Sequence, residues 1–191
     1  MFERCKWLNE PGEWALKSGR LWVKTDPETD FWRETYYDFI HDSGHSFGIQ
    51  TKGDFSAQIH VRGDFASLYD QAGLLIRVDE RNWAKAGVEL TDGALMMSSV
   101  ITLEQSDWAL GSPIATADGF WLRATVERGA LRIQFSIDGM TWPMLRLAPF
   151  LKAASYFVGA ACCSPKRGGL TVEFSEFLLM PPQQKDLHDL T

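Results

Sequence analysis

Five residues whose side chains could bind a polar ligand lie in two neighbouring stretches of the chain: Gln71, Arg77, Trp83, Lys85 and Glu89. In both stretches they alternate with aliphatic residues, which is typical of a strand with one buried face. Successive side chains of a strand point to opposite faces, so these five are expected on one outer face. An indole with an amide and both signs of charge can orient a polar ligand, and the pattern predicts a ligand groove.

The alternative is a solvated sheet face on which Lys85 or Arg77 neutralises Glu89 across the strands. Exposed ion pairs of this kind contribute little stability. The indole of Trp83 and the amide of Gln71 accompany the charges, and this favours the groove. The cations would then favour an acidic or phosphorylated sugar over a neutral one.

Aromatic side chains are a second indication, because the chain has eight tryptophans. Sugar-binding surfaces use aromatic faces as platforms for the apolar C–H groups of a pyranose, while most buried tryptophans simply pack. Trp32 and Trp108 are expected near the groove. Arg123 shares a strand face with Trp121, opposite an aliphatic set, and is added to the predicted binding residues.

A catalytic pair of carboxylates is not evident. Two acids placed two apart on one strand could approach one bond from about 5 Å, as retaining glycosidases require. Only Asp26, Glu28 and Asp30 have that spacing, and Pro27 makes their segment a loop. Glu89 could still pair with an acid of another strand, such as Asp70 or Glu104. No catalytic residue is assigned, and glycoside hydrolysis remains the third hypothesis for function.

Metal sites are not predicted either. Asp26, Glu28 and Asp30 offer oxygen ligands that would suit calcium, but acidic loops are commonly just solvated. His41 and His45 lie four apart in a segment with Ser43 and Gly44, which indicates a loop without a third ligand. We therefore expect no metal and no cofactor.

Bulk composition excludes several classes of protein. The chain has 191 residues and a net charge of −6, which disfavours nucleic acid and polybasic membrane attachment. No segment approaches the roughly 20 apolar residues of a membrane span, and no secretory signal is visible. The chain has an odd number of cysteines, namely Cys5, Cys162 and Cys163. We expect reduced thiols in a reducing compartment and a cytoplasmic location.

Strands are expected throughout the chain. Asp92-Gly93 predicts a hairpin between residues 84–91 and 94–103, because both turn residues tolerate positive φ. Further alternating runs cover 55–61, 120–127, 131–137 and 170–174. Residues 145–154 are interpreted as a short helix or an irregular crossing. Many short strands joined by Gly-containing turns predict an all-β, two-sheet sandwich, with residues 1–182 as one domain and 183–191 as a mobile tail.

These runs, together with four short motifs, resemble a known family. The motifs are Thr29-Asp30-Phe31-Trp32-Arg33, Ser98-Ser99-Val100, Ser106-Asp107-Trp108 and Ser136-Ile137-Asp138-Gly139. The chain is similar, from about Trp7 to Phe177, to the concanavalin A-like family of unknown function that includes the fungal regulation of enolase protein. It also resembles the C-terminal sandwich of some family 43 glycosidases. The resemblance implies a jelly roll of two antiparallel sheets whose concave face forms a groove, without a settled activity.

We therefore expect a non-catalytic domain that binds a carbohydrate or sugar-like metabolite on the concave sheet. The predicted ligand-binding residues are Gln71, Arg77, Trp83, Lys85, Glu89, Trp108, Arg123 and Trp32. The alternative is a protein-interaction module that regulates a metabolic enzyme, which would then be the partner.

Overall fold

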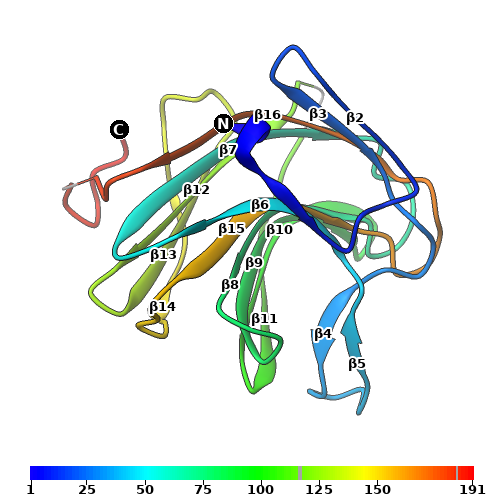
Figure 1. Ribbon diagram of the computed structural model, residues 1–191, viewed down its shortest axis with the longest axis horizontal. Coiled ribbons are helices and arrows are strands. Elements are labelled where there is room, and N and C mark those ends of the chain that lie inside the picture. The colour runs from blue at the N-terminus through cyan, green and yellow to red at the C-terminus, as the bar shows by residue number, and fades with distance from the viewer. Residues whose placement is uncertain (116–117, 184) are drawn as a thin grey trace.

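Two antiparallel sheets pack face to face in the computed structural model, which describes residues 1–115, 118–183 and 185–191 (Figure 1). We call them the front and the back sheet. The front sheet has the order β1 (Lys6–Leu8), β6 (His45–Thr51), β15 (Tyr156–Cys163), β8 (Gln71–Arg77), β9 (Asn82–Thr91), β10 (Ala94–Leu103) and β11 (Gln105–Pro113). The back sheet has the order β14 (Met144–Pro149), β13 (Ala130–Ser136), β12 (Phe120–Glu127), β7 (Phe55–Gly63), β16 (Thr171–Met180), β3 (Arg20–Lys24) and β2 (Glu13–Lys17). A short 3-10 helix, Phe2–Arg4, precedes β1. The predicted all-β sandwich is confirmed.

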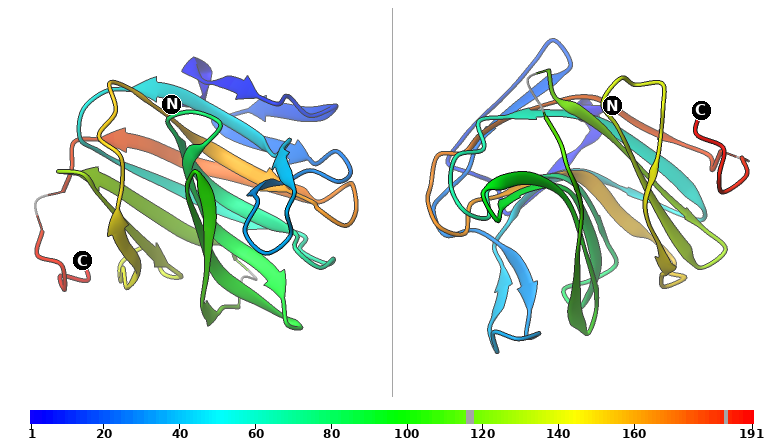
Figure 2. Two further views of the ribbon diagram at one scale, coloured as in Figure 1. Left: turned by 90° about the horizontal axis from the view of Figure 1, so that it is seen from below. Right: turned by 180° about the vertical axis from the view of Figure 1, so that it is seen from behind.

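The core between the sheets is built by the alternation seen in the sequence. Ala84, Ala86 and Val88 of β9 are buried there, and so are Ile59 and Val61 of β7. The polar residues of β9 consequently lie on the opposite face of the front sheet. The front sheet is curved, and this face is the one turned away from the back sheet (Figure 2).

The β9–β10 hairpin forms as predicted, with Thr91 paired to Ala94 around Asp92 and Gly93. The interpretation of residues 145–154 was wrong for residues 145–149, because β14 spans Met144–Pro149 and pairs with β13, whereas residues 150–154 are irregular. This strand lies at the edge of the back sheet and most of its side chains are exposed or half-buried. A strand with no fully buried face does not show a clear period of two.

A separate hairpin, β4 (Phe31–Arg33) and β5 (Ile40–Asp42), projects from the sandwich beside the front sheet (Figures 1 and 2). Its base is fixed because Phe31 and Trp32 form a second apolar cluster with Trp83 of β9. Its tip contains residues with positive φ that are not glycine, among them Glu34 and Tyr36. Such strained backbone persists only where the surrounding structure holds it.

The described part of the predicted tail lies against the back sheet, where the Trp142 amide donates to the Leu190 carbonyl at 2.8 Å. Gln184, which falls in that tail, lies outside the described residues. All three cysteines are free. Within the described ranges, no helix is long and apolar enough to cross a membrane.

Candidate functional site

The floor of the site is a row of small residues across four strands of the front sheet. Strand register places Ala161, Gly73, Gly87 and Ser98 side by side. A Cβ added to Gly73 or Gly87 would clash with backbone atoms of the facing strand, so this close approach requires glycine at both positions. The row leaves an open strip between the charged residues on either side of it.

Lys85 flanks this strip on one side and forms an ion pair with Asp30, which precedes β4. The Lys85 Nζ lies 2.9 Å from Asp30 Oδ1, and both side chains are largely buried. Burial alone lowers the pKa of the Lys85 ammonium. Asp30, assisted by Cys163 and Glu89, outweighs this effect and holds that pKa above its usual value. Lys85 therefore stays charged and its charge is already neutralised.

Glu89 flanks the strip on the other side, and only 4% of it is exposed. The Ser98 hydroxyl donates to Glu89 Oε2 at 3.1 Å, and Trp108 Nε1 donates to that hydroxyl, also at 3.1 Å. Burial raises the pKa of Glu89, although Lys85 and the Ser98 hydrogen bond oppose the shift. The Trp108 indole, which is 39% exposed, is thus oriented through Ser98 beside a buried carboxyl group.

Aromatic and apolar side chains lie beside these polar groups and together with them line a pocket of about 310 Å³. They come from the β4–β5 hairpin, from the 64–70 and 164–170 loops, and from β11. The lining is Asp30, Trp32, Tyr37, Phe39, Leu68, Tyr69, Gln71, Lys85, Glu89, Val100, Trp108, Pro165 and Lys166. The Tyr37 side chain lies close enough to Tyr69 to raise the pKa of its phenol. The hairpin and the 64–70 loop therefore both contribute to the wall of this pocket.

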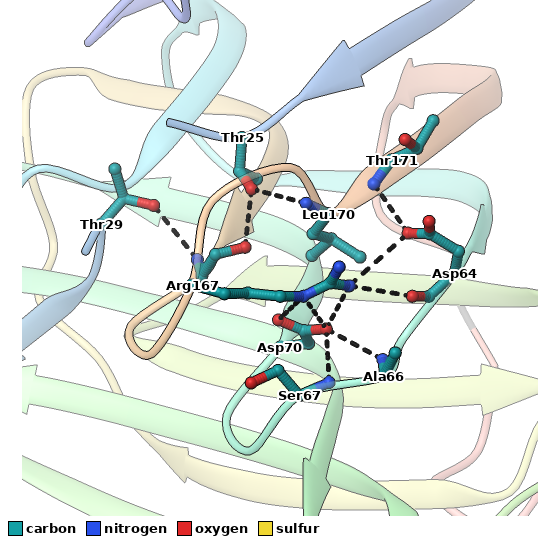
Figure 3. Close-up of polar contacts among 10 residues, drawn as sticks. Thr25, Thr29, Asp64, Ala66, Ser67, Asp70, Arg167, Leu170 and Thr171 are labelled. Carbon is teal, nitrogen blue, oxygen red and sulfur yellow. Dashed lines mark hydrogen bonds and ion pairs between the residues drawn. The ribbon is translucent and has the colours of Figure 1, made fainter. Parts of the chain in front are cut away.

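An ion pair between Asp70 and Arg167 joins the 64–70 loop to the 164–170 loop (Figure 3). Asp70 is 0% exposed and its Oδ2 accepts from Arg167 Nη2 at 2.6 Å and Nε at 2.9 Å. The backbone amides of Ala66 and Ser67 each donate to the same oxygen at 2.9 Å. Asp70 hydrogen-bonds the 64–70 loop to the 164–170 loop, and it lies between Tyr69 and Gln71, which both line the pocket.

The structure brings five of the eight predicted residues into the lining: Trp32, Gln71, Lys85, Glu89 and Trp108. Trp83 faces the predicted side but lies beneath the hairpin, 1% exposed, against Phe31. Arg77 is also outside the lining, because its guanidinium binds Asp42 of β5 in a bidentate pair, with Nη2 to Oδ2 at 2.7 Å. Both residues support the hairpin.

Arg123 was assigned to the wrong place. It lies on β12 of the back sheet, where its guanidinium is 3.8 Å from the centre of the Trp142 ring and donates to Gln58. Trp121, on the same strand face, donates to Glu176. Alternation along a strand indicates which residues share a face, but it does not tell which of the two sheets contains the strand.

The acids considered as partners of Glu89 are engaged elsewhere. Asp70 binds Arg167, and Glu104 pairs with Arg81 at the surface, at 2.7 Å. The second carboxylate of the pocket is Asp30, which belongs to the acidic loop. In the parts of the chain that the structure describes, no three His, Cys, Asp or Glu side chains are grouped as metal ligands.

Sequence reasoning missed the aromatic wall and the loop anchors. Tyr37 and Phe39 belong to an aromatic run at the hairpin tip that contains Tyr36 as well. That run was a signal for a surface role, because its apolar residues do not alternate as those of a half-buried strand do. Tyr69 and Arg167 had no such signal, since a single residue in a loop shows no periodicity.

Comparison with known proteins gives a consistent family and fold. A family model described as "Protein of unknown function (DUF1349)" matches residues 7–182. A Saccharomyces cerevisiae protein named "Regulation of enolase protein 1" is 51% identical over 185 residues, which cover 97% of this chain and 93% of the yeast protein. The crystal structure of a functionally unknown S. cerevisiae protein superposes with a TM-score of 0.93 at 49% identity, over 95% of this chain and 98% of that one.

More distant structures share the fold alone. The Bacillus licheniformis GH43 protein BlXynB (K247S mutant) has a TM-score of 0.71 at 15% identity, over 94% of this chain and 37% of that one. The carbohydrate-binding module CBM66 from Bacillus subtilis has a TM-score of 0.60 at 14% identity, over 91% and 94%. The resemblance to the sandwich of family 43 enzymes is confirmed.

Proposed function

Since the chain belongs to the family described as Protein of unknown function (DUF1349), whose name assigns no activity, we propose a function from its own pocket. The pocket binds an uncharged, hydroxyl-rich ligand, namely a sugar or a sugar-like metabolite. The observation that carries the proposal is the combination of three buried polar side chains, Lys85, Asp30 and Glu89, with aromatic walls. Polar groups of both kinds can satisfy hydroxyls while an aromatic face covers the apolar side of a ring.

Charge pairing favours a neutral ligand over the acidic one suggested by the sequence. Lys85 is neutralised by Asp30, and Arg77 by Asp42. Arg123 lies on the back sheet. An anionic ligand would have to compete with Asp30 for Lys85, and it would lie near the buried Glu89. Among the described lining residues, Lys166 is the one further cation, and it is exposed.

Thermal shift tests the proposal, because a ligand that binds only the native state raises the melting temperature by mass action. The panel contains neutral monosaccharides, polyols, uronic acids and sugar phosphates. At 100 times the dissociation constant the gain is about 2.7 kcal/mol, which corresponds to roughly 5 to 11 °C for a chain of this length. We expect a rise with a neutral sugar.

Two tryptophan variants provide the matched comparison. Trp108→Ala removes an indole of the pocket, and Trp22→Ala removes one of similar exposure on the back sheet. The shift should disappear in Trp108→Ala and persist in Trp22→Ala. A shift that only sugar phosphates or uronic acids produce would contradict a neutral ligand, and no shift with any of the compounds would contradict sugar binding.

The hairpin tip supports a second candidate function, contact with a metabolic enzyme. Tyr36 is 89% exposed and Ile40 52%, so this hairpin presents large apolar side chains to solvent, as surfaces that contact another protein do. The name of the yeast relative points to enolase as the enzyme to test. Purified enolase should bind the wild type and should not bind Tyr36→Ser/Ile40→Ser. Equal binding of both forms would exclude the tip as the contact.

A further inference from the structure

Gln71 and Glu89 lie opposite one another on two neighbouring strands of the front sheet. The register of β8 and β9 makes them direct partners, and the Cα atoms of such partners are roughly 4.5 to 5.5 Å apart. Both side chains line the pocket. The pair therefore presents an amide and a carboxyl group side by side to a molecule that occupies the pocket.

The carboxyl group of this pair is held by one of its two oxygens. Glu89 Oε2 accepts from the Ser98 hydroxyl, and that hydroxyl accepts in turn from Trp108 Nε1. Lys85, on the same face of β9, pairs with Asp30 instead of Glu89. The hydrogen bond to Oε2 fixes the orientation of the carboxyl group, so the position of the second oxygen, Oε1, is defined before a ligand binds.

The remaining hydrogen-bonding capacity of the pair is unused. Among the residues that the structure describes, none forms a hydrogen bond with Glu89 Oε1 or with the side-chain amide of Gln71. Neither group is one of the fully buried polar atoms that lack a partner, so both are accessible from the pocket. Polar groups in such positions are nearly always hydrogen-bonded, and their partners must come from the pocket.

From this pair we infer that the ligand presents two adjacent hydroxyl groups, one of which donates to Glu89 Oε1 while the other hydrogen-bonds to the Gln71 amide. The inference rests on the proposed function and narrows the ligand class to sugars and polyols with an unsubstituted vicinal diol. A hydroxyl can donate to a carboxylate, and it can either donate to an amide or accept from it. A fluorine or an ether oxygen in place of the first hydroxyl cannot donate to Glu89.

Calorimetric titration of the full chain with fluorinated sugars tests the inference. The probes are glucose, mannose, galactose and xylose, together with the derivatives of each in which one non-anomeric hydroxyl is replaced by fluorine. For a sugar that binds, fluorine should weaken binding at two adjacent positions, roughly tenfold or more at the position that contacts Glu89 and threefold or more at its neighbour. The first effect is larger because a hydrogen bond to a charged group is stronger than one to an amide. A sugar without two adjacent sensitive positions would overturn the inference.

Two variants assign the two sensitive positions to the two side chains. Glu89→Gln should bind the unmodified sugar roughly tenfold more weakly, and fluorine at the more sensitive position should then weaken binding by less than about threefold. In Gln71→Met the effect of fluorine should disappear at the neighbouring position instead. The control is Gln50→Met, which changes an exposed glutamine of β6 outside the pocket lining and should bind every probe as the wild type does. Undiminished fluorine effects in both Glu89→Gln and Gln71→Met would overturn the assignment of the pair.

Failure of the inference can be distinguished from failure of the proposed function. The fluorine series is measured on the wild type, so its result does not depend on how well either variant folds. If none of the unmodified sugars binds to the wild type, the proposed function fails and the inference fails with it. If a sugar binds but lacks two adjacent sensitive positions, sugar binding stands and only the recognition of a diol by Gln71 and Glu89 is overturned.

Discussion

Replacement of Arg167 by methionine should destabilise the protein strongly, although this side chain is partly exposed. Methionine retains the apolar stem of arginine and removes only the guanidinium. Asp70 would then keep its two backbone donors, Ala66 and Ser67, and lose the cation that binds it. Because Asp70 is 0% exposed, its charge would remain buried without a counter-ion.

The magnitude follows from burial. Removal of one partner of a buried ion pair typically costs about 3 to 5 kcal/mol, because a charge remains buried without its counter-ion. The Arg167 side chain is 28% exposed, so solvent can reach part of the vacated space. We therefore expect a loss of about 2 to 4 kcal/mol. This loss corresponds to a melting temperature lower by roughly 4 to 16 °C.

Urea unfolding at pH 7 measures the effect, and Arg81→Met is the matched control. Arg81 binds Glu104 at 2.7 Å, almost the same distance as in the Arg167–Asp70 pair. Both side chains of the Arg81–Glu104 pair, however, are more than half exposed. Surface pairs contribute about 0 to 1 kcal/mol, and this contribution should vanish in 1 M salt, where the screening length is about 3 Å. The loss in Arg167→Met should persist there.

The reasoning would be refuted if the two methionine variants lost the same free energy of unfolding. It would also be refuted if Asp70→Asn, combined with Arg167→Met, lost as much as the sum of the single variants. The structure predicts a smaller loss, because the double variant leaves no unpaired charge buried. Ligand affinity should fall in Arg167→Met as well, since Tyr69 and Gln71 adjoin Asp70.

Two further predictions concern Gly87 and Glu89 of β9. Gly87→Ala should destabilise the protein by about 1 to 3 kcal/mol, because its Cβ would clash with the backbone of Ala72. Urea unfolding measures this loss. The control is Gly12→Ala, whose Cβ would contact only Asp26 Oδ1 at 3.3 Å and which should therefore destabilise the protein less. An equal cost in both would contradict the close approach of the strands. The pKa of Glu89 is raised in the folded state, so the native protein binds its proton more tightly than the unfolded chain does. The free energy of unfolding of the wild type relative to Glu89→Gln should therefore be greatest below about pH 4.3 and should fall as the pH rises towards the raised pKa of Glu89. Urea unfolding measured between pH 4 and 8 checks this. A difference in unfolding free energy that increases with pH would contradict the prediction.

Sequence alone determined the strands whose residues alternate with a period of two, and the face of the strand on which each of their side chains lies. The alternation around Lys85 and Glu89 has a period of two, and this period also places Ala84, Ala86 and Val88 in the core. Asp92-Gly93 determined the β9–β10 turn, because few other residue pairs accept its backbone angles. Each of these conclusions depends on residues near one another in the chain.

Only the tertiary structure decided which faces meet. It placed Arg123 on the back sheet and Asp30 beside Lys85. It also brought Tyr37 and Tyr69 into the lining of one pocket, and Asp70 to Arg167. These contacts join residues far apart in sequence, and no local period encodes them. The proposed ligand site therefore has polar residues on β8 and β9 that the sequence predicts, and walls that exist only because the hairpin and two loops lie beside these strands.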